Sequence, residues 1–443
     1  MSRRDRRSTR RRLRPASSAV LVIGVVAAAA AGSGAATTRA PTSRPARSST
    51  ATPAATRAAT PPAAGPAAAV TAFGVDLMAR IGGSGNMVFS PYSVASVVAM
   101  AGTGASGATA RQIAGVLHLR SAKQIAGIGT LSGTLAREQS AAAGGAKDAP
   151  QLDLANGLFL QQGFPLLPAF TRTLASGFGA GPQPVDFEHD PTAATAAINQ
   201  FVSSHTAGVI PTILSPGQLD STTRLALVNA IYLKAGWAEP FQVSATASGG
   251  FRAPGGTRTV RFMNETDALP YMKGPGYQAV ELPYRSSTLA LLVLKPAGTE
   301  ATLQKAVTPG LIRRTTAALR PVDVGLRMPR FHVSLAATLN SALARLGMTD
   351  AFSPTAADFL GISRTPLYLS LVQHEADFTV DEQGTIATAA TVGGLSTTSV
   401  EVPPRPAVTV DLNRPFPFYL IDTKTGAVIF AGRLTDPSAA PAP

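Results

Sequence analysis

The sequence Lys-Thr-Gly at 424–426 is the pattern that most suggests covalent chemistry, because serine acyl-transfer enzymes carry it between two strands. Those enzymes also need a Ser-x-x-Lys motif for the nucleophile, and no serine of this chain has a lysine three positions later. Ser-Asp-Asn and Gly-x-Ser-x-Gly motifs are missing as well. The pattern therefore favours a hairpin turn in which Gly426 supplies a positive φ angle. An acyl-serine hydrolase is the least favoured function.

The histidines offer neither a metal site nor an evident general base. The five of them include no His-Glu-x-x-His motif and no pair at ligand spacing, and the chain has no cysteine. His374 lies within an apolar run, where a histidine is more often a hydrogen-bonded core residue than a base. The Gly-x-Gly-x-x-Gly pattern at 102–107 follows an expected helix rather than a strand, which favours a turn over a dinucleotide site. We therefore expect no catalytic residue, no metal and no cofactor.

The elements that position these residues differ between the two halves of the chain. The first half favours helices, with Ser90 as the N-cap of the second and Pro91 in its first turn. Another helix is expected late in the chain and closes at Gly347. The predicted helices are 69–81, 90–101, 107–119, 191–206 and 335–347.

The second half is dominated by β-branched and aromatic runs that Pro, Gly and Asn interrupt. Helices followed by many strands predict an α+β fold with large mixed, mainly antiparallel β-sheets, rather than a repeating βαβ chain. The segment 141–149 is expected to be a loop between helices. The predicted strands are 224–237, 277–284, 288–296, 323–334, 367–380, 407–412, 415–422 and 427–434.

Composition divides the chain into four segments. Residues 1–36 join an arginine-rich start to an apolar run at 16–32, which predicts a signal peptide or, alternatively, a membrane anchor. Residues 37–69 are rich in Ala, Thr, Pro, Ser and Arg, which predicts a disordered linker. Residues 70–436 have a globular composition, and 437–443 are expected to be a disordered tail.

The net charge of +14 does not indicate a nucleic-acid partner. Residues 1–60 hold twelve arginines and one acid, and the rest of the chain carries 27 basic and 24 acidic residues. A nucleic-acid binder gathers basic residues on its folded body, whereas here they precede it. We expect an extracellular, secreted protein or, as the alternative, one anchored to the outer face of the membrane, with 16–32 as a possible tether.

A tract of small residues follows the strand predicted at 367–380. The segment 381–394 reads Asp-Glu-Gln-Gly-Thr-Ile-Ala-Thr-Ala-Ala-Thr-Val-Gly-Gly, without proline or aromatic residues. Gly384 can serve as a hinge, and the small alternate side chains from Thr385 onward would fit between two existing strands. A flexible linker has a similar composition, so both interpretations stay open on this tract alone.

Several long stretches, taken in order, resemble the serpin family. They cover almost all of 70–436, which makes the resemblance far more specific than any single motif. The expected fold is therefore serpin-like, with an exposed reactive loop. The matching stretches are 86–117, 227–241, 280–284, 330–362, 382–391 and 413–434.

The resemblance implies a suicide-substrate inhibitor of serine proteases, not an enzyme. Segment 382–404 would be the reactive loop, which a protease attacks and which then inserts into the main sheet. The residues that resemble the hinge of inhibitory serpins are Glu382, Gly384, Thr385, Ala387, Ala389 and Ala390. A non-inhibitory serpin-like binding protein is the alternative, which bulky or charged hinge residues would have favoured.

The resemblance also assigns residues that control the opening of the sheet. Four of them match a polar cluster beneath the sheet, and the fifth matches an aromatic residue near the entry point of the loop. The residues are Ser90, Ser93, Asn229 and His374 for the cluster, and Trp237 for the entry point. Ordinary capping and core hydrogen bonding would explain the first four as well.

The family spacing from the hinge places the reactive bond at Thr398–Ser399, whereas counting back from the strand at 407–412 places it nearer Glu401. The residues beside the bond are small or β-branched, which suits the shallow pocket of an elastase- or subtilisin-like protease better than a trypsin-like pocket with its buried carboxylate. We expect a serine protease as the partner, no nucleic acid, and a monomer.

Overall fold

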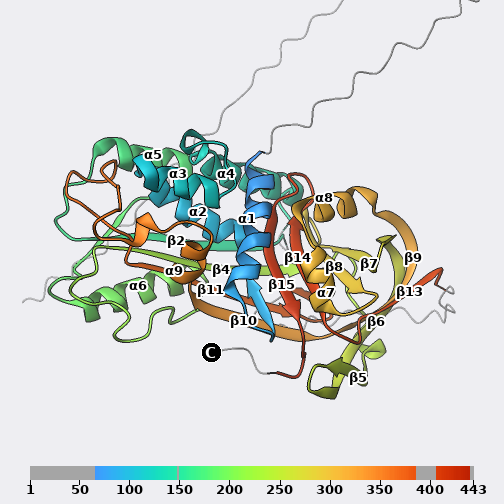
Figure 1. Cartoon of the computed structure of the whole chain (residues 1–443). Coiled ribbons are helices and arrows are strands. Elements are labelled where there is room, and N and C mark those ends of the chain that lie inside the picture. The colour runs from blue at the N-terminus through green and yellow to red at the C-terminus, as the bar shows by residue number, and fades with distance from the viewer. Residues whose placement is uncertain (1–64, 147–148, 386–405, 440–443) are drawn as a thin grey trace, which may run out of the picture. The chain divides into compact units, whose positions relative to one another are not determined.

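The computed structural model describes residues 65–146, 149–385 and 406–439. The leader, most of the linker and the predicted reactive bond Thr398–Ser399 lie outside these residues, as do Ala387, Ala389 and Ala390. Within the described ranges, helices prevail before residue 206 and strands prevail after residue 225, as the sequence predicts (Figure 1). The fold is the α+β fold expected.

Proline begins several of the helices, because its fixed φ angle suits the first helical position and its missing N–H group is not needed there. The second helix is also capped as predicted, since the Ser90 side chain accepts a hydrogen bond from the Ser93 N–H group. The helices of the described residues are α1 (Pro66–Ile81), α2 (Pro91–Gly102), α3 (Gly107–Val116), α4 (Gly127–Ala143), α5 (Pro168–Phe178), α6 (Pro191–His205), α7 (Glu300–Ala306), α8 (Pro309–Ala318) and α9 (Asn340–Arg345).

The larger of two sheets holds nine strands. Its order is β1-β15-β14-β8-β7-β6-β9-β13, and β5 pairs with β6 beside this path. All its pairs are antiparallel except that of β13 with β9. The bounds are β1 (Met87–Phe89), β5 (Ala247–Ala253), β6 (Gly256–Gly274), β7 (Tyr277–Pro283), β8 (Leu289–Pro296), β9 (Arg320–Pro329), β13 (Val408–Asp411), β14 (Phe416–Asp422) and β15 (Val428–Leu434).

The second sheet carries the residues of functional interest. Its order is β10-β11-β4-β2-β3, and a two-residue strand, β12, pairs with β4 beside this path. The bounds are β2 (Gln151–Gln161), β3 (Gln183–Val185), β4 (Leu225–Gly236), β10 (Phe331–Thr338), β11 (Leu371–Val380) and β12 (Gly384–Thr385).

Helices cover both faces of this second sheet. Leu227 and Ile231 of β4 belong to the main core with α2, whereas Ala226 and Val228 join a separate core beneath α6. Alternate residues of a strand point to opposite faces, so the two helices lie on opposite sides, as Figure 1 shows for α2 and α6. Every residue of α2 is buried, which small side chains along the helix allow.

The boundaries of the globular part differ from those predicted. Helix α1 begins at Pro66, and Ala69, which the sequence assigned to the linker, is buried with 1% of its surface exposed. At the other end, the Asp436 carboxylate accepts hydrogen bonds of 2.9 and 2.6 Å from the N–H and hydroxyl groups of Ser438. The part of the predicted tail up to residue 439 thus forms a turn.

Two predictions about elements were wrong. The helix predicted at 335–347 begins only at Asn340, because β10 runs to Thr338 and pairs with Gln373 of β11. This tertiary ladder overrides the local preference for helix. The loop at 141–149 does not join two helices, because the next element is β2.

Among the described residues, no helix combines the length and the apolar character that crossing a membrane requires.

Candidate functional site

The central feature of the second sheet is a gap at one end of its middle pair. Strands β11 and β4 run parallel and pair from Leu371↔Ala226 to Ala376↔Ile231. Beyond that point β11 continues along β10 to Val380, and β4 continues along β2 to Lys234. In the described residues the facing edges of β11 and β4 have no mutual pairing there, so this end of the sheet is open to an additional strand.

The chain turns back into this gap directly after β11. The Asp381 carboxylate accepts hydrogen bonds of 2.8 Å from Gln383 N–H and 3.2 Å from Gly384 N–H, and Asp381 N–H donates to Gly384 O at 3.0 Å. Gly384 has φ 154°, and a Cβ atom there would lie 2.0 Å from Ala235 O. Only glycine fits, which explains the hinge glycine physically.

After the turn, β12 forms the first two residues of an added strand. Gly384 and Thr385 pair antiparallel with Gly236 and Ala235 of β4, and β12 contacts both β4 and β11. Thr385 is 1% exposed, and its hydroxyl is hydrogen-bonded to the hydroxyl of Tyr284. The predicted hinge residue therefore lies inside the sheet.

Trp237 holds the turn from one side. Its indole N–H donates to Asp381 O at 2.9 Å, and its backbone N–H donates to Gln383 O at 2.9 Å. Its ring stacks on that of Tyr284 with centroids 4.6 Å apart. It follows the last residue of β4 and lies eight residues after Asn229, about 26 Å away at the usual rise per residue of a strand. Trp237 therefore lies beside the hinge, apart from the polar cluster, which agrees with the position near the loop's entry point that the family resemblance implies.

Glu382 holds the turn from the other side. It is 4% exposed, accepts a hydrogen bond of 2.7 Å from the Thr246 hydroxyl, and forms an ion pair of 3.2 Å with Arg330. Its backbone carbonyl accepts a hydrogen bond from Phe241 N–H at 2.9 Å. A carboxylate buried to this extent is stable because both of its oxygens have partners.

Glu382→Ala is expected to destabilise the folded protein by about 1–2 kcal/mol. Hydrogen bonds to charged groups contribute about 1.5–3 kcal/mol, and here the Arg330 side chain is partly solvated, which weakens its share. Scanning calorimetry measures the effect, with Glu382→Gln as the control that keeps an acceptor for Thr246 and should lose less. An alanine variant as stable as the parent would contradict this role.

The polar cluster predicted beneath the sheet is assembled in the structure. Ser90, Ser93, Asn229 and His374 are all fully buried. The Asn229 side-chain amide donates to the Ser93 hydroxyl and to Asn156 Oδ1, and the Ser93 hydroxyl donates to Asn156 Oδ1 at 3.2 Å. The cluster joins α2 to three strands of the sheet.

His374 closes the cluster across β11 and β4. Its Nδ1 lies 2.5 Å from Asn229 Oδ1, and its Nε2 accepts a hydrogen bond of 3.2 Å from Ser90 N–H. Because Nε2 accepts, the ring proton resides on Nδ1 and the imidazole is neutral. Burial lowers the pKa of His374 to about 3, since a charged ring would lose its hydration. His374 therefore links β11 to β4 through a hydrogen bond and does not act as a base.

Sequence reasoning missed several partners of this site, among them Asn156, Tyr284 and Arg330. Asn156 lies in β2, a strand that was not predicted. Tyr284 and Arg330 stood within stretches used for the family resemblance, but no local signal links them to residues about 101 and 52 positions away. Only pairing across the sheet could have identified them.

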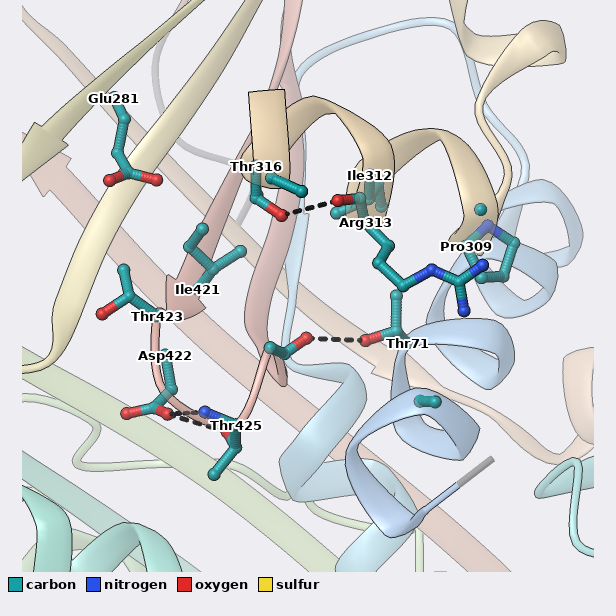
Figure 2. Close-up of a pocket in the computed structure, with 14 residues that line it drawn as sticks. Thr71, Glu281, Pro309, Ile312, Arg313, Thr316, Ile421, Asp422, Thr423 and Thr425 are labelled. Carbon is teal, nitrogen blue, oxygen red and sulfur yellow. Dashed lines mark hydrogen bonds between the residues drawn. The ribbon is translucent and has the colours of Figure 1, made fainter. Parts of the chain in front are cut away.

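The Lys-Thr-Gly motif lies in the predicted hairpin turn, between β14 and β15, where Gly426 has φ 72°. Asp422 Oδ1 accepts hydrogen bonds of 2.7 and 2.8 Å from the N–H and hydroxyl groups of Thr425. The turn borders a cavity of about 460 Å³ between α1 and α8 (Figure 2). Its described lining holds threonines but no serine, lysine or histidine, so it offers no serine nucleophile with a basic partner.

Histidine and acidic side chains give no metal site either: in the described ranges, no three of them are grouped so as to hold an ion.

The comparisons with known proteins agree on one family. A family model described as Serpin (serine protease inhibitor) matches residues 68–437. Leukocyte elastase inhibitor A of Mus musculus is 35% identical over 84% of this chain and 99% of its own length. A serpin-like protein of Thermococcus kodakarensis is 32% identical over 83% of this chain and 85% of its own length.

Solved structures lead to the same fold. The native-state crystal structure of tengpin, a thermophilic serpin, has a TM-score of 0.74 and 25% identity, and covers 83% of this chain and 93% of its own. Serpin-12 of Manduca sexta has a TM-score of 0.72 and 25% identity, and covers 85% of this chain and all of its own.

Proposed function

Since this chain belongs to the serpin family of serine protease inhibitors, we propose that segment 382–404 is its reactive loop and that cleavage lets this loop insert between β11 and β4. The protease serine attacks the carbonyl carbon of Thr398, the Thr398–Ser399 bond breaks, and an ester joins the protease to the new carboxyl end. Insertion of the loop then carries the attached protease away before water cleaves the ester. The observation that carries this proposal is β12, which already forms the first two residues of the inserted strand.

The present register of β12 predicts where the loop ends in the sheet. Gly384 pairs with Gly236 and Thr385 with Ala235, so extension of this ladder brings Gly394 opposite Ala226. Ala226 is also where the β4–β11 ladder begins. The tract of small residues is thus long enough to lie between β11 and β4 over the full length of their present ladder.

The same register assigns the inserted side chains to the two faces of the sheet. Thr385 and every second residue after it would face the core, because their partners on β4, such as Ala235 and Ile231, belong to the main core. These positions hold Ala387, Ala389 and Thr391, which are small. Thr391 would come opposite Asn229. Insertion there would break the hydrogen bond between Asn229 and His374, and the Thr391 hydroxyl would supply a new polar partner.

Insertion is favourable because it adds a ladder of backbone hydrogen bonds on both sides of the new strand and buries its core-facing side chains. The uncleaved fold would hold this free energy in reserve: among the described residues, Gly384 and Thr385 are the two that pair with β4 in the gap. Cleavage frees one end of the loop and so allows the release.

We propose an elastase- or subtilisin-like protease as the target. Thr397, Thr398, Ser399 and Val400 suit a small, shallow pocket, and the mouse relative is named as an inhibitor of leukocyte elastase. We also propose that the protein acts outside the cytoplasm as a monomer. The arginine-rich start and apolar run of residues 1–36 support export, by a cleaved signal or a retained anchor.

Incubation with elastase-, subtilisin- and trypsin-like proteases tests the proposal. We expect an SDS-stable complex with a protease of one of the first two classes, and a released fragment that begins at Ser399. Mass spectrometry of the fragment identifies the bond directly. Cleavage without any complex would point to a non-inhibitory serpin, and a fragment that begins at Pro406 would overturn both the bond and the specificity, because Arg405 would then occupy the pocket.

A further inference from the structure

A group of positive side chains that protease inhibition does not use gathers on the larger sheet. We call Arg252, Lys295 and Arg414 the basic cluster; they come from β5, from β8 and from the connection between β13 and β14. Arg252 N–H donates to the carbonyl of Asn413 at 2.8 Å, which brings β5 beside Arg414. Three separate segments therefore converge here.

The Arg414 guanidinium reaches toward the end of β8. Its Nη1 donates to Ala297 O at 3.3 Å and to Gly298 O at 3.4 Å, just past Lys295. Both contacts are long, and they use only one of its three nitrogen atoms. They fix the position of the charge without neutralising it.

Among the described residues, no acidic side chain forms an ion pair with the basic cluster. The acid whose charge acts on Lys295 is Asp411, and its two oxygens already accept hydrogen bonds of 2.8 Å from Arg327 and from Asn413. Arg414 Nε is buried without a partner, and the side chains of Arg252 and Lys295 form no hydrogen bond or ion pair within the described ranges. A buried donor left unpaired is costly, which makes this position unusual.

The electrostatics agree with the geometry. Burial lowers the pKa of Lys295, the positive charges of Arg414 and Arg252 lower it further, and Asp411 opposes them only in part. Positive charges that repel one another beside a single shared carboxylate favour the entry of an anion. Arg252 is exposed and the other two side chains are half-buried, so an ion can approach from solvent.

We propose that the basic cluster binds a small divalent oxyanion, phosphate or sulfate. The planar fork of an arginine matches two oxygens of such an ion, and the compact ammonium of Lys295 adds a point charge. This inference goes beyond protease inhibition and does not depend on loop insertion.

The position of the basic cluster gives the ion a structural consequence. Strand β13 follows the reactive loop and is the edge strand of its sheet, paired with β9. An ion held jointly by Arg414, Arg252 and Lys295 would fasten the chain just after β13 to β5 and β8. Its binding therefore stabilises the attachment of the loop.

Thermal unfolding with phosphate or sulfate, at ionic strength matched with sodium chloride, tests the site. We expect a saturable rise of about 2–4 °C in the midpoint with either ion, from stabilisation by mass action. Arg252→Gln changes an exposed residue and should fold normally. We expect it to weaken phosphate affinity several-fold, and Lys295→Met to abolish the shift.

The control is Lys273→Gln, which removes an exposed charge of β6 outside the basic cluster and should leave the phosphate shift unchanged. Calorimetric titration with phosphate gives the affinity of each folded variant directly. An equal shift from chloride alone, or an unchanged phosphate affinity in Arg252→Gln, would overturn the proposal.

Discussion

Thr385→Arg is expected to convert this inhibitor into a substrate. The Thr385 side chain is buried beside Ala235 and bonded to Tyr284, so an arginine there would have to enter the core without an acidic partner. An unpaired buried charge costs several kcal/mol. The hinge would leave the sheet, the loop would still be cleaved, and insertion would be too slow to trap the protease.

The expected result is at least a tenfold rise in the amount of inhibitor consumed per protease, since a tenfold change in partitioning needs only about 1.4 kcal/mol. Electrophoresis measures it as cleaved protein in place of the SDS-stable complex. Thr385→Ser is the matched control, because it keeps the hydroxyl that contacts Tyr284 and should still trap protease. Complete complex formation by the arginine variant would refute the insertion route.

The second large effect is a loss of stability in acid that originates at His374. In the folded protein the pKa of His374 is about 3, because the ring is buried, whereas a histidine in the unfolded chain has a pKa of about 6.5. Below pH 6.5 the unfolded chain therefore binds a proton that the folded protein does not. Stability falls as the pH drops from about 6.5 toward 3, by up to about 1.4 kcal/mol per pH unit.

Buried carboxyl groups with raised pKa values act in the opposite direction. Burial raises the pKa of Glu265, Glu281 and Glu375 to about 7, so their contribution is fully present below pH 4.5 and is lost as the pH rises through 7. These groups remain when His374 is replaced. A comparison of two proteins across the same pH range therefore isolates the histidine.

His374→Gln provides that comparison, because an amide can accept from Ser90 N–H and donate to Asn229 without titrating. Between pH 7.5 and 4.5 we expect the parent to lose about 2–3 kcal/mol more than the variant, measured by urea denaturation. The same dependence on pH in both proteins would contradict the burial of a neutral imidazole at this position.

Features that depend on neighbouring residues were correctly predicted from the amino-acid sequence. Ser90 and Pro91 predicted the start of α2, and Gly426 predicted the turn between β14 and β15. Long stretches in family order indicated the serpin fold. These predictions succeed because capping, turn geometry and local patterns are properties of a few adjacent residues.

Tertiary structure decided what depends on pairing between distant strands. Local preference favours a helix from residue 335, yet β10 continues to Thr338 because β11 pairs with it there. The sequences of β11 and β4 also do not indicate that the two strands separate beyond Ala376. This separation creates the gap that the hinge enters.

The partners of the site follow the same rule. Tyr284 reaches Thr385, and Arg330 reaches Glu382, only because the sheets bring their strands together. The sequence shows which side chains of a strand share a face. The strand that pairs with it, and the register of that pairing, are set by the packing of the whole molecule. The hinge could therefore be predicted from the sequence, whereas the residues that hold it in place could be identified only from the tertiary structure.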